Sequence, residues 1–385
     1  MENILVVLDK NDMVVTKDGQ TLKIKRSDAP AQTVPFRFIG QVMVHGNPMV
    51  SCGVWAALAE WGIPAVIFSN RGSSAPAWLG SGLTTSTMAR ISQHNAAQNP
   101  AVRARVGGWL IHKKISGHLA VLAVIREMIS DNKKERWPLL SDSPLSPKKI
   151  VAGVARAEKI MRLCLDGMAS ASDTESLMGH EGVAAAAWFD FLRGTLPKKW
   201  LFSGRNRRPP KDPVNALLSL TYTIAMSEMR RAVHQRGLDP CIGFLHSPAP
   251  GREAMTIDML ELLRPGSDAF VLGLLGENGL TPDHFSVTDK NGCRLNKEGR
   301  GIYYEAWAER RNSWPLWTLK SDAECLDGND FEDGNGSGFD DDSDDDSEDD
   351  FGDDFDDDSG NTFKPLSNCC RWAVWQSVLL WDEAV

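Results

Sequence analysis

One histidine and two carboxylates surround a short turn in the stretch GFLHSPAPGREAMTIDMLELLRP, residues 243–265. His246 ends an apolar run, while Asp258 and Glu261 stand three residues apart at the start of a predicted helix and share one of its faces. The Pro/Gly turn between them can bring the imidazole back beside the helix. Such a set is typical of a Mg²⁺ or Mn²⁺ site, because these ions prefer oxygen ligands with at most one or two nitrogens. The alternative is a surface helix with two solvated acids and an incidental histidine.

A third carboxylate, Glu181, lies in the Ala-rich helical pattern SLMGHEGVAAAAWFDFLRG. Burying it without a cation or a hydrogen-bonding partner is costly, and the small residues at 184–187 allow another backbone to approach. In the alternative arrangement, the helix turns Glu181 toward water. The neighbouring His180 points about 100° away on a helix and is not chosen as a ligand.

A basic loop precedes a third helix in the stretch GRNRRPPKDPVNALLSLTYTIA. Asp212 is a predicted N-cap, and Pro213 opens the helix. Cations held by rigid prolines at a helix entrance suit phosphate binding, whereas the alternative is an ordinary solvated loop. The basic residues in this loop are Arg205, Arg207, Arg208 and Lys211.

The elements that must position these residues belong to two regions of the chain, which differ in their local sequence pattern. Residues 1–85 contain short β-branched runs separated by turn signals, which predict a β-rich N-terminal domain. From about residue 86 the apolar spacing becomes helical, so residues 86–325 are predicted to form a larger, all-helical domain. The expected fold class is α+β. Within the larger domain, helices are predicted at 147–168, 175–193, 213–236 and 253–264.

The acidic residues are concentrated near the C-terminus. The chain has 51 acidic and 42 basic residues, and 18 of the acids lie between 327 and 358. The remaining 33 acids against 42 basic residues give the body a charge of +9, a sign that suits nucleic-acid binding. The low-complexity segment 326–362 is predicted to be a disordered linker. It is expected to tether a terminal helix, or alternatively to compete with DNA for the basic surface.

The last segment, 363–385, is strongly apolar and is predicted to be a docking helix. Trp372, Trp375 and Leu379 recur at helical spacing, and a neighbouring face carries other apolar residues. That neighbouring face consists of Val374, Val378 and Trp381.

The cysteines and the apolar runs bear on the cellular compartment. Seven cysteines occur without a C-x-x-C pair, which argues against a disulfide framework and a zinc ribbon. No apolar run approaches a membrane span, and the first residues do not resemble a secretory signal. A cytoplasmic protein without membrane attachment is therefore expected.

Several stretches occur together in an order that resembles the CRISPR-associated protein one family, the integrase subunit of spacer acquisition. They are VTKDGQTLKIKR, IGQVMVHGN with LAEWGIPAVIFSNRG, ISQHNAAQNP, LMGHEG, RNRRPPKDPVNALLSL, and GFLH followed by GREAMTIDMLELLRP. The likeness covers most of residues 1–320. It implies a β-rich domain that forms a homodimer and a helical domain that carries one divalent-metal site.

The resemblance also implies roles for individual residues. Glu181 of LMGHEG, His246 of GFLH and Glu261 of DMLELLRP match the family's metal ligands and catalytic residues. Many members have Asp at the position of Glu261, so Asp258 is kept as an alternative ligand or a helper. Arg205, Arg207, Arg208, Lys211, Asn215 and Arg252 are expected to contact DNA.

The implied reaction is a Mg²⁺- or Mn²⁺-dependent transesterification, in which the 3′-hydroxyl of a prespacer attacks the repeat DNA. The implied partners are prespacer and repeat duplexes, a second copy of the chain, and the small CRISPR-associated protein two. Two alternatives stay open, an endonuclease without integration and a catalytically silent DNA-binding assembly subunit.

Overall fold

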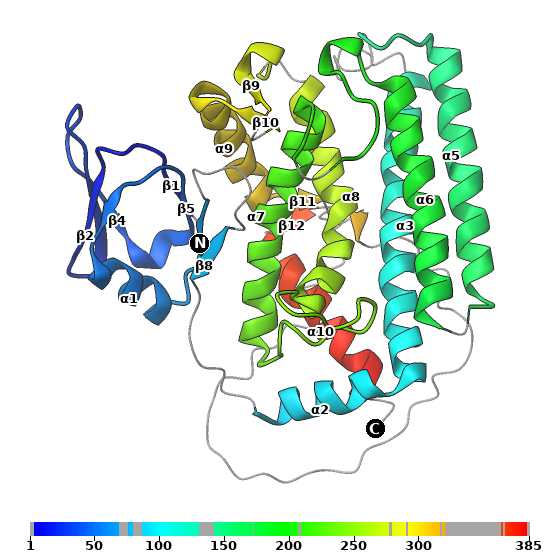
Figure 1. Ribbon diagram of the computed structural model, residues 1–385, viewed down its shortest axis with the longest axis horizontal. Coiled ribbons are helices and arrows are strands. Elements are labelled where there is room, and N and C mark those ends of the chain that lie inside the picture. The colour runs from blue at the N-terminus through cyan, green and yellow to red at the C-terminus, as the bar shows by residue number, and fades with distance from the viewer. Residues whose placement is uncertain are drawn as a thin grey trace.

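A computed structural model gives the fold of the chain (Figure 1). It describes residues 4–68, 76–79, 87–130, 142–171, 173–206, 209–276, 279–289, 292–315, 318–319, 363–364 and 366–382. The predicted acidic linker 326–362 lies outside these ranges.

The N-terminal part contains two four-stranded sheets, blue in Figure 1. The first has the order β1-β5-β7-β8, with β1, β5 and β7 parallel and β8 antiparallel to β7. The second has the order β4-β3-β2-β6, in which β2 and β6 are parallel. The strands are β1 Ile4–Leu8, β2 Val14–Asp18, β3 Thr21–Lys25, β4 Gln32–Pro35, β5 Ile39–Val44, β6 Met49–Val50, β7 Ala65–Ile67 and β8 Ala77–Leu79.

A short helix in the described residues of this part is α1 at Cys52–Glu60. It precedes Gly62, whose φ of 59° is a left-handed conformation that glycine adopts without steric cost, as at many helix ends. A 3₁₀ turn, Phe36–Phe38, lies between β4 and β5. Buried side chains of both sheets and of α1 form a separate small core. The predicted order of strands followed by helices is confirmed.

The larger part consists mainly of helices. The α-helices are α2 Thr87–Gln98, α3 Pro100–Ser130, α5 Pro147–Met168, α6 Thr174–Thr195, α7 Pro213–Gln235, α8 Ala254–Gly276, α9 Lys297–Asn312 and α10 Leu366–Asp382. In Figure 1 most of them lie to the right of the strands, with α7, α8, α3, α6 and α5 upright and α2 across the bottom. Two further 3₁₀ turns occupy Lys198–Trp200 and Pro282–His284. Within the described residues, none of the helices has the length and apolar character needed to cross a membrane.

Two features of this part differ from the sequence-based expectations. It is not all-helical, because β9 (Phe285–Thr288) pairs antiparallel with β10 (Gly292–Leu295), and β11 (Trp314–Pro315) pairs with β12 (Phe363–Lys364). The Asn-Gly pair at 291–292 is a hairpin signal in the sequence that the prediction of an all-helical domain did not take into account.

The predicted helix 253–264 is also too short, because α8 continues through Pro265 to Gly276. An internal proline removes one helical hydrogen bond and usually ends a helix. Here α8 is buried along nearly its whole length and packs against α3 and α7, so tertiary contacts hold it together. Gly117 of α3 makes room, because a Cβ at that position would lie 2.7 Å from Cγ of Pro265.

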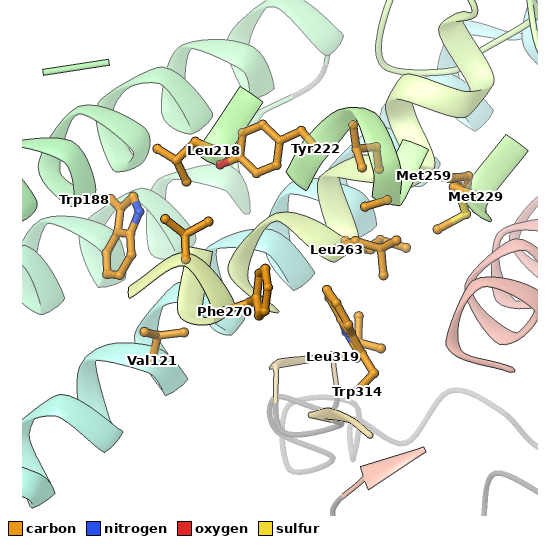
Figure 2. Packing of buried hydrophobic residues seen from close by; sticks show 14 of the residues in the cluster. Val121, Trp188, Leu218, Tyr222, Met229, Met259, Leu263, Phe270, Trp314 and Leu319 are labelled. Carbon is orange, nitrogen blue, oxygen red and sulfur yellow. The ribbon is translucent and has the colours of Figure 1, made fainter. Parts of the chain in front are cut away.

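The central core lies where α7 and α8 meet, and side chains from α3, α6 and the segment after α9 close it (Figure 2). Large rings fill much of this space. They include Trp188, Tyr222, Phe270 and Trp314.

The terminal helix α10 packs against α7, α3, α8 and α2. Val374, Val378 and Trp381 are buried, whereas Leu379 is 39% exposed. The described residues that make the contact therefore belong to the face with Val374, Val378 and Trp381. The side chains of Trp372 and Trp375 lie outside the described part.

Candidate active site

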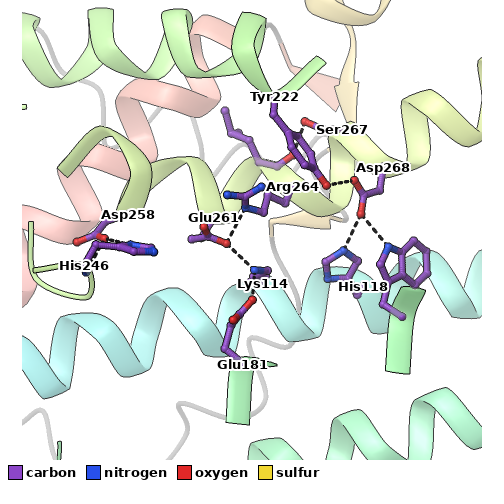
Figure 3. Close-up of polar contacts among 12 residues, drawn as sticks. Lys114, His118, Glu181, Tyr222, His246, Asp258, Glu261, Arg264, Ser267 and Asp268 are labelled. Atoms are coloured by element: carbon purple, nitrogen blue, oxygen red, sulfur yellow. Dashed lines mark hydrogen bonds and ion pairs between the residues drawn. The ribbon is translucent and has the colours of Figure 1, made fainter. Parts of the chain in front are cut away.

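Asp258 fixes the turn that carries His246 (Figure 3). Its Oδ2 accepts hydrogen bonds from the backbone N–H groups of Phe244 (2.6 Å) and Leu245 (2.9 Å). Its Oδ1 accepts one from the N–H of His246 (3.0 Å) and lies 2.6 Å from the ring Nδ1. The carboxylate is fully buried. These contacts fill the sites at which a carboxylate usually accepts, so Asp258 orients the histidine.

Gly243 allows the turn to come this close to α8. A Cβ at Gly243 would lie 2.6 Å from Oδ2 of Asp258 and 2.8 Å from the carbonyl carbon of Ala254. Any larger side chain there would push the turn away from the helix. The first residue of the GFLH stretch therefore has a packing role.

The contact with Asp258 also sets the protonation of His246. It raises the pKa of the imidazole above its ordinary value, since this hydrogen bond and the nearby negative charges of Asp258 and Glu261 outweigh the opposing effects of burial and Arg264. With Nδ1 directed at Asp258, Nε2 is the nitrogen that can bind another group. In Figure 3 the ring extends from Asp258 toward Glu261.

Glu261 lies one turn further along α8 and is buried between two cations. Its Oε2 is 2.5 Å from Nζ of Lys114 and 2.7 Å from Nε of Arg264. Burial alone would raise the pKa of Glu261, but the charges and hydrogen bonds of Arg264 and Lys114 outweigh it and lower the pKa. The predicted alternative of two solvated acids on a surface helix is therefore wrong.

Glu181 approaches the same lysine from α6. Its Oε1 forms an ion pair with Nζ of Lys114, and its side chain is 25% exposed. Ala184 and Ala187 of the same helix are buried, and α6 packs against α3 and α5. His180 points toward α5 instead, because a Cβ at Gly167 would lie 2.5 Å from its ring. Glu181 and Glu261, 80 positions apart in the sequence, are thus joined by one ammonium group.

Arg264 is itself held in place from behind. Its guanidinium lies 4.6 Å from the ring centre of Tyr222, whose hydroxyl donates to Asp268. Asp268 also accepts a hydrogen bond from Nε1 of Trp188 (2.8 Å) and lies 3.1 Å from Nε2 of His118. This buried network fixes the cation beside Glu261.

The predicted DNA-binding residues fall into two groups. Arg205 points inward: its guanidinium donates to Oδ1 of Asn215 (2.8 Å) and lies 5.6 Å from the ring centre of Tyr222. Asn215 is buried and donates to the Asp212 cap and to the carbonyl oxygen of Gly204. Both residues hold the loop together in this structure.

The second group comprises Lys211 and Arg252, which are exposed. Nη1 of Arg252 lies 3.4 Å from the carbonyl oxygen of Ser247, just after His246. Arg207 and Arg208 lie outside the described residues. Of the four that the structure describes, Lys211 and Arg252 therefore have the positions best suited to reach a phosphate.

The arrangement can hold a cation between two carboxylates. Among the described residues, no three His, Cys, Asp or Glu side chains are gathered closely enough to bind an ion as they stand. The place between Glu181 and Glu261 is taken by the ammonium of Lys114. A positive group thus already stands in for a cation there, and the oxygen-rich donors with one imidazole fit Mg²⁺ or Mn²⁺.

Sequence reasoning did not include Lys114 and Arg264 in this site. Lys114 follows Lys113 in a helix that carries several other basic residues, so the pair resembles an ordinary solvated basic patch. Arg264 stands three residues after Glu261, and that helical spacing was the available signal for an ion pair.

Solved structures share this fold. A casposase bound to an integration product has a TM-score of 0.65 and 21% identity, covering 81% of this chain and 84% of the casposase. A Cas6-RT-Cas1–Cas2 complex has a TM-score of 0.63 and 20% identity over 80% of this chain. The matched region is 32% of that longer subunit. The fold is therefore that of the Cas1-like proteins.

Sequence comparison gives the family directly. The family described as CRISPR associated protein Cas1 matches residues 6–309. CRISPR-associated endonuclease Cas1 2 of Rhodospirillum rubrum is 32% identical over 301 residues, covering 77% of this chain and 82% of the relative. The chain belongs to the Cas1 family.

Proposed function

We propose that this protein is a divalent-metal-dependent DNA integrase of CRISPR adaptation. The observation that carries the proposal is the convergence of Glu181 and Glu261, from two separate helices, on one cation beside an oriented His246. The names of its relatives support nuclease chemistry, and the casposase with its integration product supports strand transfer on this fold.

Glu181, Glu261 and Nε2 of His246 are the groups that would hold Mg²⁺ or Mn²⁺. When bound, the ion would polarise the scissile phosphate and stabilise charge on the departing oxygen. Asp258 would act as a positioning residue, because its contact with Nδ1 leaves Nε2 available and fixes the ring. Asp258 is accordingly proposed as the helper, and Glu261 as the direct ligand.

The proposed reaction is a phosphodiester exchange. The 3′-hydroxyl of a prespacer forms a new P–O bond with a phosphate of the repeat, and the bond from that phosphorus to the existing 3′ oxygen breaks. Lys211 and Arg252 would hold neighbouring phosphates, because both are exposed and cationic. Arg207 and Arg208 remain candidates for the same role.

The proposed partners are duplex DNA, a second copy of the chain, and Cas2. A Cas2 partner is supported by the complex with a similar fold, whose name includes Cas1 and Cas2. We propose dimerisation through the strand-rich N-terminal part and a cytoplasmic site of action.

A catalytically silent assembly subunit is the second candidate. It is favoured by Lys114 and Arg264, whose two positive charges already balance those of the two carboxylates without an added ion. An endonuclease that uses water as the nucleophile is a variant of the main proposal at the same site.

One experiment separates these three functions. The protein is incubated with a prespacer, a repeat-bearing plasmid and Mn²⁺, with and without Cas2. Covalent joining of prespacer to plasmid supports integration. Nicking without joining supports the endonuclease, and DNA binding without either product supports the silent subunit.

A further inference from the structure

Lys114 is buried, and a buried lysine usually needs negatively charged partners. It lies on α3 with 8% of its side chain exposed, and its ammonium contacts Glu181 of α6 and Glu261 of α8. A buried ammonium is stable only when paired, so these contacts are what allow Lys114 to remain charged inside the protein. The proposed DNA reaction gives this lysine no role.

The charges of the four side chains paired around Lys114 balance without an added ion. Glu181 and Glu261 carry two negative charges, while Lys114 and Arg264 carry two positive ones. Adding a divalent cation to this arrangement would leave an excess of two positive charges in a largely buried space. Such an excess is unfavourable, so binding an ion requires that one positive group give way.

The two cations differ in how firmly they are held. Arg264 lies on the ring of Tyr222, with 11% of its side chain exposed, and pairs with a carboxylate on its own helix. Lys114 has a flexible four-carbon stem and makes point contacts through a single nitrogen atom. Lys114 is therefore the group that can move.

We propose that Lys114 is an internal counter-ion that holds the two acidic side chains together before metal binding and competes with the divalent ion for them. The inference rests on the proposed metal site. It implies that the chain keeps a folded, charge-balanced site in the absence of metal, at the expense of metal affinity.

Removing the ammonium should therefore strengthen metal binding. The Kd for Mn²⁺ is measured by calorimetry for the full chain, for Lys114→Met and for Lys199→Met. Lys199 forms an exposed ion pair with Asp142, so the control loses the same charge elsewhere. We expect Lys114→Met to bind Mn²⁺ more tightly by on the order of tenfold, a typical size for coupling between two ligands. Lys199→Met should match the wild type.

Metal-free stability gives a second measurement. In EDTA, Lys114→Met should melt at a lower temperature than the wild type, since two carboxylates then share a buried space with one cation. Mn²⁺ should raise its Tm by more than it raises that of the wild type.

A third measurement uses the wild type and does not depend on a variant that folds. Trace acetylation of lysines is followed by mass spectrometry with and without Mn²⁺. Modification of Lys114 should increase when the ion is added, while that of Lys199 should stay constant.

Four results would overturn the inference. Equal Mn²⁺ affinity in Lys114→Met and wild type would show that the ammonium does not compete, as would unchanged acetylation of Lys114. Weaker binding by Lys114→Met would show that the lysine assists the ion. If neither protein binds Mn²⁺, the metal site of the proposed function fails, and the inference fails with it.

Discussion

Nδ1 of His246 lies 2.6 Å from Oδ1 of Asp258, and the same carboxylate accepts the backbone N–H groups of residues 244–246. One buried side chain thus determines the path of the turn and the orientation of the ring. The sequence places Asp258 and Glu261 on one face of the helix, but the two side chains have different roles. Asp258 faces the turn, whereas Glu261 faces Lys114.

Asp258→Asn should weaken metal binding while keeping the ligands themselves. The amide presents an NH₂ group toward backbone donors, so part of the turn loses its acceptor. Loss of such an orienting partner typically costs about 10–100-fold in metal affinity. Calorimetry with Mn²⁺ measures this, and exposed Asp190→Asn serves as a control. Unchanged affinity in Asp258→Asn would show that the turn orients His246 without the carboxylate.

Mn²⁺ affinity should depend on pH through His246. Its pKa is raised above the ordinary value of 6.5, so a proton competes with the ion up to a pH above 6.5. The affinity for Mn²⁺ should rise as the pH increases from below 6.5 to the raised pKa of His246, and it should level off above that pKa. The Asp258→Asn variant should shift the rise to lower pH, because the main cause of the raised pKa is lost.

In the metal-free protein, titration of His246 should make the fold less stable as the pH rises. A folded-state pKa above the unfolded value adds stability that is fully present below pH 6.5 and is lost as pH rises through the raised pKa. Denaturant melts in EDTA across this range measure it. A pH-independent difference between wild type and His246→Ala would contradict the assignment.

Neutralising Lys211 and Arg252 should weaken binding to unrelated duplexes alike. For each lost phosphate contact, the slope of log K against log[salt] should become less steep by about 0.9, where K is the association constant for the duplex. Arg205→Ala provides the contrast: this side chain points into the protein, so its loss should lower stability more than it changes the salt slope. Titrations of a labelled random duplex at several salt concentrations test both. An unchanged slope in the Lys211/Arg252 variant would show that these residues face away from DNA.

Trp381 should link the terminal helix to the active-site turn. Its ring stacks on Phe244, with centroids 4.7 Å apart and planes 20° apart, and it is almost fully buried. Trp381→Ala should cost about 3–5 kcal/mol in the free energy of unfolding, as is typical of large buried aromatic side chains. Leu379→Ala, on the exposed side of α10, should cost far less. Similar losses for both variants would show that α10 contributes little through this contact.

Local sequence patterns were enough for much of the fold. Asp212 and Pro213 predicted the start of α7. Pro265 led to a predicted helix that is too short, because the local effect of a proline is to end a helix. Burial against α3 at Gly117 keeps α8 continuous instead. That outcome depends on residues about 150 positions away.

The same limit applies to the site. The turn around His246 is local and could be read from its spacing. The contacts of Glu181 and Glu261 with Lys114 join three helices, and no periodicity within one helix reveals them. Likewise, the type of Arg205 indicated DNA binding, but its inward direction follows from Asn215 and Tyr222.

The most direct measurement is the yield of covalently joined prespacer and repeat DNA, with Cas2 and Mn²⁺, for wild type and His246→Ala. The variant must match the wild type in Tm and in its elution volume, so that only the site differs. The account predicts joined product from the wild type, none when EDTA replaces Mn²⁺, and at most trace product from His246→Ala. Wild-type yield from His246→Ala, or equal yield in EDTA, would contradict it.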